Sequence, residues 1–190
     1  MKIATILPYK ENYTISKAQA AAIWVCDFFK YSKFKENNFI FGNTKSKDYL
    51  TKNYINIDIG NLKSKFTSST KEYCKNFIKK TKDLNFDIVE IHNRPLVFHY
   101  LEKEINSKFI LYFHNDPLSM NGSKTTKERL DLLDKLDKII FVSKWVQDRF
   151  FIDLDKKLLN KTEIVYPSIH KTNIKLKKKN KITFVGKLNK

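Results

Sequence analysis

The chain of 190 residues is poor in the residues that bend or cross-link a polypeptide: it has four glycines, four prolines and two cysteines. This composition excludes collagen-like and linker-like chains. Cys26 and Cys74 have no partner at metal-ligand spacing and are too few for a disulfide framework, so we expect two buried apolar thiols. No apolar run approaches the roughly 20 residues that span a bilayer. Pro8 and Lys10 interrupt the apolar N-terminus before a signal-peptide core could form, and we therefore predict a cytoplasmic protein.

Arginine is also scarce. The formal net charge is +17, but almost all basic residues are lysine, and the only arginines are Arg94, Arg129 and Arg149. Specific base recognition relies on bidentate arginine, and the chain has no helix-turn-helix or RNA-binding signature, so we predict no nucleic-acid partner. Residues 156–190 hold eleven lysines and one acidic residue. Such a segment is either a solvated linker or a surface attracted to an anionic membrane, at about 1 kcal/mol per lysine near an acidic leaflet.

Apolar β-rich runs alternate with helical patterns along the chain. The runs predict strands at residues 2–7, 38–41, 54–59, 86–91, 109–113, 138–142, 163–166 and 182–186. The patterns between them predict helices near residues 16–31, 68–82, 95–105, 130–136 and 144–151. This alternation predicts an α/β class: a Rossmann-like, three-layer domain with a mostly parallel sheet covered by helices on both faces. In such a sheet, ligands bind beyond the carboxyl ends of the strands, here the loops after Leu7, Ile91 and Phe113.

Serines mark three of the predicted helix starts. Ser16 is expected to cap the first helix, and Ser143 the last. Ser68 or Ser69 begins the second helix, with Glu72 placed for a capping box.

Five segments, in this order and spacing, resemble the N-terminal, acceptor-side domain of the retaining glycosyltransferases of family 4, which have the GT-B fold. They are residues 86–95 (FDIVEIHNRP), 109–117 (FILYFHNDP), 136–146 (LDKIIFVSKWV), 163–168 (EIVYPS) and 182–188 (ITFVGKL). The resemblance implies an acceptor-side domain over residues 1–170, a basic interdomain linker over 171–181, and the first strand of a donor-binding domain over 182–190. The rest of that second domain, including the family's paired-glutamate motif, is then missing.

The resemblance also implies roles for single residues. His114 matches the histidine that lies by the donor sugar, so we assign it the catalytic role; the alternative is a histidine that satisfies a loop carbonyl. Gly186 and Lys187 match the contact to the donor diphosphate, where a cation would offset the charge that develops on the leaving nucleotide. The family's first loop is often glycine-rich. Here Ser16 and Lys17 stand instead, either as side-chain donors to the acceptor or, for Ser16, as a plain helix cap.

The loop after the predicted strand 86–91 carries His92, Asn93 and Arg94. They either bind an acceptor sugar or phosphate or form loop structure. Asp116 could orient an acceptor hydroxyl, although a cap or turn role competes with that reading. His92 and His114 have no acidic or cysteine partner at ligand spacing. Since the resemblance also implies metal-independent chemistry, we expect no metal and no cofactor, with a nucleotide sugar as co-substrate.

Two functions follow as hypotheses. In the first, the chain is part of an enzyme that transfers a sugar from a nucleotide-sugar donor to a glycan or glycolipid acceptor with retention of configuration. Lipopolysaccharide or cell-envelope biosynthesis is the expected setting, with peripheral contact to the inner face of the membrane. The fragment alone would be inactive, because the reaction centre lies between two domains. The alternative is a free-standing basic module that binds anionic membrane or glycan surfaces without catalytic activity.

Overall fold

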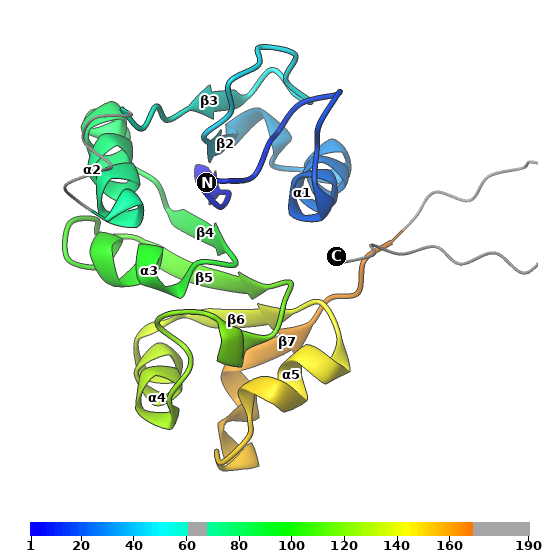
Figure 1. Ribbon diagram of the computed structural model, residues 1–190, viewed down its shortest axis with the longest axis vertical. Coiled ribbons are helices and arrows are strands. Elements are labelled where there is room, and N and C mark those ends of the chain that lie inside the picture. Colours follow the sequence, from blue (N-terminus) through cyan, green and yellow to red (C-terminus); the bar gives the residue numbers. More distant parts are fainter. Residues whose placement is uncertain (61–67, 169–190) are drawn as a thin grey trace, which may run out of the picture.

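Seven parallel strands form one sheet in the order β3-β2-β1-β4-β5-β6-β7 (Figure 1). The computed structural model of the chain describes residues 1–60 and 68–168. The strands are β1 (Ile3–Ile6), β2 (Asn38–Gly42), β3 (Tyr54–Asn56), β4 (Ile88–His92), β5 (Lys108–Phe113), β6 (Lys138–Phe141) and β7 (Thr162–Ile164). Every neighbouring pair is parallel. The strand order reverses between β1 and β4, and this is the kind of switch point beside which open α/β sheets bind ligands.

Helices cover the two faces of this sheet. They are α1 (Ala20–Tyr31), α2 (Ser69–Thr81), α3 (Pro95–Leu101), α4 (Thr126–Lys135) and α5 (Lys144–Phe150), with 3-10 turns η1 (Lys35–Asn37), η3 (Pro117–Ser119) and η4 (Lys156–Lys161). Figure 1 shows α2, α3 and α4 along one face and α1 on the opposite face. The predicted Rossmann-like three-layer class is confirmed, and within the described residues the sheet is wholly parallel.

The larger of the two apolar cores lies between the sheet and α2, α3, α4 and α5. Its phenylalanines pack both edge to face and stacked: the Phe41 and Phe77 ring centroids are 4.9 Å apart at 84°, and those of Phe113 and Phe141 are 5.8 Å apart at 15°. Phe150 joins α5 to the sheet, with centroids 5.5 Å from Phe113 and 5.3 Å from Phe141. Burial of one such side chain contributes about 1.5–3 kcal/mol relative to exposure. These contacts therefore fix α5 against β5 and β6, two strands of the sheet interior.

Two predicted caps are wrong. The first helix begins at Ala20 with Gln19 at its N-cap, not at Ser16. Ser16 instead donates its amide and hydroxyl to Asp48 Oδ2, at 3.1 and 2.9 Å. That carboxylate satisfies both donors of Ser16, and the helix starts one turn later.

The capping box expected at Glu72 does not form either, because the side chain of the N-cap Ser68 makes no cap hydrogen bond. The box occurs in α4, where Thr125 Oγ1 accepts from the amide of Glu128 and the Glu128 carboxylate accepts from the amide of Thr125. The Ser143 cap is confirmed, since its hydroxyl accepts from the Val146 amide.

Other predictions concern strand ends and the thiols. The strand predicted over 54–59 is shorter, and β3 covers Tyr54–Asn56. Cys26 and Cys74 are buried and unpaired, as expected.

The predicted linker over 171–181 and the strand over 182–190, with Gly186 and Lys187, lie outside the described residues. In the part of the chain that the structure describes, no helix is long and apolar enough to cross a bilayer.

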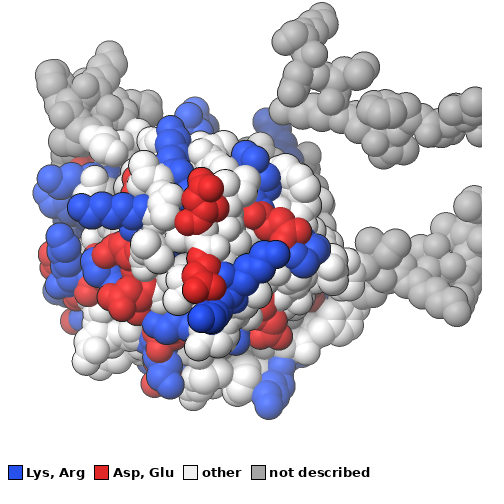
Figure 2. Space-filling model, turned by 90° about the horizontal axis from the view of Figure 1, so that it is seen from below, with Lys and Arg blue, Asp and Glu red and all other residues white. Residues whose placement is uncertain are grey.

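The positive charge is unevenly divided between the described and undescribed residues. Ten of the 37 basic residues and none of the 20 acidic ones lie in 61–67 and 169–190, which leaves 27 basic against 20 acidic residues in the described body. Figure 2 shows the two signs intermixed over the face seen from below in the orientation of Figure 1. Independently of that view, the Nζ of Lys135 lies 3.0 Å from Asp131 and 3.4 Å from Glu102. The described body is therefore closer to neutral than the whole chain.

Candidate active site

Two histidines meet where β4 and β5 end. His92 is the last residue of β4, and His114 follows β5 directly. Their rings are joined by a 2.8 Å contact between His92 Nδ1 and His114 Nε2. Burial lowers the pKa of His92 well below its usual value, and the neighbouring His114 lowers it further. Burial also lowers the pKa of His114, to about 4. Both imidazoles are therefore neutral at pH 7, and one proton lies between them.

Asn93 locks this pair in place. Its Oδ1 accepts from the His114 amide at 2.7 Å, and its own amide donates to the Tyr112 carbonyl at 2.8 Å. The residue has a φ of 54°, in the left-handed region that asparagine tolerates better than most side chains. The side-chain oxygen of Asn93, one of the predicted acceptor residues, is thus already hydrogen-bonded within the chain.

Arg94 lies at the start of α3 and remains partly open to solvent. Its Nη1 donates to the Asn93 carbonyl at 2.9 Å, and its guanidinium carbon lies 5.9 Å from the centre of the Tyr9 ring. One of its five N–H groups is thus used by the backbone contact. The remaining face of the guanidinium is available to an anionic or hydroxylated ligand.

Trp24 is the main contact that sequence reasoning missed. Trp24 lies on α1. Its ring centroid is 5.2 Å from that of His114 and 5.6 Å from that of His92, and both ring pairs are T-shaped. On the other side, His92 stacks on Tyr112 at 4.5 Å and 10°. The apolar positions that identified the first helix did not include Trp24, and no sequence spacing relates it to strands seventy and ninety residues away.

Asp116 is fully engaged within the protein. Its Oδ1 accepts from the Leu118 amide at 3.0 Å, which caps η3. Its Oδ2 accepts from Nε and Nη2 of Arg149, at 3.1 and 2.8 Å. The Arg149 hydrogen bonds hold the pKa of this carboxyl below its usual range. The competing cap role weighed for Asp116 is therefore present in the structure.

Two adjoining hollows open along the carboxyl edge, and the first contains Asn93 and Asn115, the neighbours of the two histidines in sequence. The first, of about 340 Å³, is lined by Asn93, Arg94 and the η3 turn. The second, of about 800 Å³, is lined by four exposed lysines and by amide and hydroxyl side chains: Lys10, Lys17, Lys45, Lys47, Asn12, Asn43, Thr44 and Asn56. Tyr9 and Lys10 line both. Of the predicted acceptor residues, Asn93 and Arg94 thus line the first hollow and Lys17 lines the second, whereas Ser16, His92 and Asp116 line neither.

The lysines of the larger hollow form no salt bridge with an acidic residue within the described part of the chain, although Asp48 interacts electrostatically with Lys17. Asp58 is the one acidic residue in the lining. Four cations against one anion on a concave surface produce a positive potential there. As to metals, residues 1–60 and 68–168 contain no cluster of three or more histidine, cysteine or acidic side chains that could hold an ion.

Comparison with known proteins connects this geometry to solved structures. No family model and no curated protein matches the sequence. The lipopolysaccharide outer core galactosyltransferase WaaB, in its apo form, matches 92% of this chain at a TM-score of 0.64 and 16% identity. Sucrose-phosphate synthase from Thermosynechococcus elongatus matches 87% of this chain at a TM-score of 0.57 and 10% identity. Anabaena HepE in complex with UDP matches 89% of this chain at a TM-score of 0.54 and 10% identity.

These three proteins are GT-B glycosyltransferases. The chain spans about half the length of each: 48% of WaaB, 48% of sucrose-phosphate synthase and 44% of HepE. At identities this low, the likeness establishes the fold. The protein has the architecture of one GT-B domain, as the sequence predicted.

Proposed function

We propose that the chain is the acceptor-side half of a retaining, metal-independent glycosyltransferase that moves a sugar from a nucleotide-sugar donor to a glycan or glycolipid. The observation that carries the proposal is the neutral histidine pair at the ligand edge of a GT-B domain. Support also comes from the neighbours. Among the similar solved structures, WaaB is named as a lipopolysaccharide outer core galactosyltransferase, and HepE was solved with UDP and with UDP-glucose.

In this proposal, His114 contacts the donor sugar by hydrogen bonding. A neutral imidazole can exchange a hydrogen bond with a sugar hydroxyl without adding a positive charge near the anomeric carbon. Trp24 and Tyr112 pack around the pair and limit its contact with water, and Asn93 fixes the loop that carries it. The donor's diphosphate would be held elsewhere, by Gly186 and Lys187 together with a donor-binding domain.

The acceptor would occupy the edge of the sheet beside the pair. Arg94 and the lysine-lined hollow offer cationic and amide donors, which suit a sugar that carries phosphate or carboxylate. Asn12 and Asn43 would recognise its hydroxyls, because each uses one of its side-chain polar atoms in a contact within the chain, Oδ1 of Asn12 and Nδ2 of Asn43. Ser16 is bound to Asp48, so Lys17 is the better candidate of the two residues proposed in the first loop.

The test is release of nucleotide from a panel of uridine, adenosine and guanosine diphosphate sugars in the presence of a glycolipid extract. The 190-residue chain alone should give no turnover. A longer protein, in which residues 1–190 continue into a donor-binding domain, should release nucleotide, and His114→Ala should reduce its rate by a factor of about 100 or more. Turnover by the short chain alone, or full activity of the variant, contradicts the proposal.

A further inference from the structure

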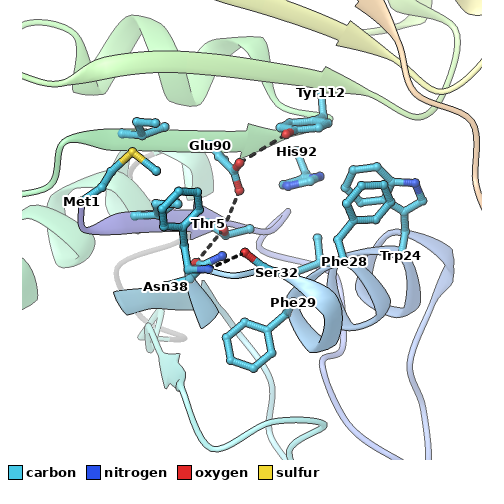
Figure 3. Close-up of a pocket in the computed structure, with 14 residues that line it drawn as sticks. Met1, Thr5, Trp24, Phe28, Phe29, Ser32, Asn38, Glu90, His92 and Tyr112 are labelled. Atoms are coloured by element: carbon cyan, nitrogen blue, oxygen red, sulfur yellow. Dashed lines mark hydrogen bonds between the residues drawn. The ribbon is translucent and has the colours of Figure 1, made fainter. Parts of the chain in front are cut away.

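A row of polar side chains runs across the face of the sheet that α1 covers. Successive side chains of a strand point to opposite faces, so Glu90 and His92 of β4 share one face, and Tyr112 and His114 share it on β5. Figure 3 shows Glu90, His92 and Tyr112 around a hollow between the sheet and α1, with Trp24 and other aromatic side chains on its helical side. The hollow has a volume of about 220 Å³. It connects the buried middle of the sheet to the histidine pair.

His92 has one ring nitrogen without a partner. Nδ1 is bonded to His114, but the buried Nε2 has no hydrogen-bond partner among the described residues. An unsatisfied buried polar atom is unfavourable, and native proteins rarely leave one. The hollow is lined by both His92 and Glu90 and is large enough for several water molecules. A water held between Nε2 and the Glu90 carboxylate would satisfy both groups.

Glu90 is built to be a hydrogen-bond acceptor. Its Oε2 accepts from the Thr5 hydroxyl at 2.8 Å and its Oε1 from the Tyr112 hydroxyl at 3.2 Å. Burial raises the pKa of Glu90 above its usual value, and the hydrogen bonds from Thr5 and Tyr112 offset only part of that rise. The Thr5 hydroxyl has one hydrogen and also lies 3.0 Å from Asn38 Oδ1, but its contact with Glu90 is the shorter of the two. With that hydrogen on Glu90, each carboxyl oxygen has one donor, which fits an ionised carboxyl that accepts on both oxygens and donates on neither.

The position of this carboxylate decides where the proton of the histidine pair lies. A carboxylate in the hollow favours the His92 tautomer that carries its hydrogen on Nε2, facing the negative charge. Nδ1 of that tautomer is a lone pair, so it must accept from His114 Nε2. His114 then carries its hydrogen on Nε2 as well, and its Nδ1 has none. In the opposite arrangement, His92 Nδ1 donates to His114 Nε2, and the lone pair of His92 Nε2 faces the hollow and the carboxylate.

We propose that Glu90 is a positioning residue, which acts through His92 to hold His114 in the Nε2–H tautomer, so that Nδ1 of His114 is a hydrogen-bond acceptor at the edge of the sheet. This deepens the proposed function, because it specifies that His114 accepts a hydrogen bond from a hydroxyl of the ligand and does not donate one. The arrangement moves no proton in the resting protein. It is a property of this chain alone and can be tested without any sugar.

The test is long-range proton–nitrogen correlation NMR of the ¹⁵N-labelled 190-residue chain at pH 7, which distinguishes the two imidazole tautomers. We expect both His92 and His114 as Nε2–H tautomers. In Glu90→Gln the ratio should shift toward the Nδ1–H form of His114 on the order of tenfold, since hydrogen bonds to charged groups exceed neutral ones. Glu90→Asp should restore part of the preference. Glu104→Gln removes an exposed carboxylate that follows α3, away from the histidine pair, and should change nothing.

An Nδ1–H tautomer of His114 in the unaltered chain would overturn the proposal, and this measurement needs no variant to fold. An unchanged ratio in a folded Glu90→Gln, judged by its backbone amide spectrum, would overturn it equally. A failure of the transferase assay with the tautomers as expected would contradict the proposed function alone.

Discussion

Arg149 donates two hydrogen bonds to the same oxygen of Asp116, from Nε at 3.1 Å and from Nη2 at 2.8 Å. The pair joins α5 to the turn that follows β5, two residues beyond His114. A helix from late in the chain thereby fixes the turn that carries the proposed catalytic side chain. The contact is partly exposed, and such pairs contribute little to global stability.

We therefore predict that Arg149→Gln changes the position of the turn more than the stability of the fold. The His114 ring signals should shift in NMR spectra, while the urea midpoint stays nearly constant. Lys144→Gln, which breaks the exposed pair with Asp148 on the same helix, is the matched control and should leave His114 unmoved. Because Arg149 lowers the pKa of Asp116 below 3.8, the pair's small contribution is present above that pH and is lost as the pH falls below it.

The histidine pair predicts acid sensitivity. His114 has a pKa of about 4 in the folded protein and about 6.5 when unfolded, so the unfolded chain binds its proton first as the pH falls. The free energy of unfolding should thus be fully retained above pH 6.5. It should decrease by up to about 1.4 kcal/mol per pH unit between 6.5 and 4 for this residue.

Urea denaturation as a function of pH checks this prediction. The variant His114→Gln lacks the pH-dependent part of the unfolding free energy that His114 contributes. The difference in unfolding free energy between the unaltered chain and this variant should therefore diminish steadily below pH 6.5. His92, whose pKa is lowered further, prolongs the loss to more acidic pH in both proteins. A difference that is independent of pH between 4 and 7 would show that His114 is not held neutral.

Arg129 is a buried cation that supports the backbone. Only 2% of its surface is exposed, and its guanidinium donates to the carbonyls of Lys124 at 2.8 Å and Ile152 at 2.6 Å. Arg129→Met keeps an unbranched apolar stem but leaves these carbonyls without a donor, so we expect a loss of about 2–4 kcal/mol in the free energy of unfolding. Lys127→Met, at an exposed position of the same helix, should cost less than about 0.5 kcal/mol. Equal losses would contradict the prediction.

The lysine-lined hollow predicts a preference for anionic sugars. The double variant Lys45→Gln with Lys47→Gln should weaken binding of a phosphorylated sugar on the order of tenfold at low salt, because two exposed cations leave the hollow. Titration calorimetry against the phosphorylated and the neutral form of one sugar measures the effect. Lys124→Gln with Lys127→Gln makes the same change in net charge elsewhere. If both double variants bind alike, the hollow is not the site.

The sequence predicted the strands well because their apolar runs and turn residues are local signals. The segments 109–113 and 138–142 are almost entirely apolar, and they became β5 and β6 inside the sheet. Strand ends also located the candidate site, because His92 and His114 occupy the last position of one strand and the first after another. Their direct contact could not be predicted, since it depends on which strands are neighbours and in what register.

Other parts of the site depend on contacts that no local pattern reveals. Ser16 carries a good capping side chain, yet Asp48, thirty-two residues away, binds it instead. Trp24 lies on a helix, and its role beside the histidines follows from the way α1 crosses the sheet. The polar row of Glu90, His92, Tyr112 and His114 did have a sequence signal, the alternation of polar residues in two apolar strands. The four residues form a row only once β4 and β5 are paired in register, with His92 beside Tyr112.

The position of β1 in the middle of the sheet has a consequence for synthesis on the ribosome. β1 lies between β2 and β4, and its residue Thr5 is bonded to Glu90, eighty-five positions later. Until β4 has been made, the first strand can pair on one side only and presents an open edge to the cell. Pairing over such separations is slow and exposes nascent chains to aggregation. We therefore expect the N-terminal third of this protein to depend on chaperones until translation has passed residue 92.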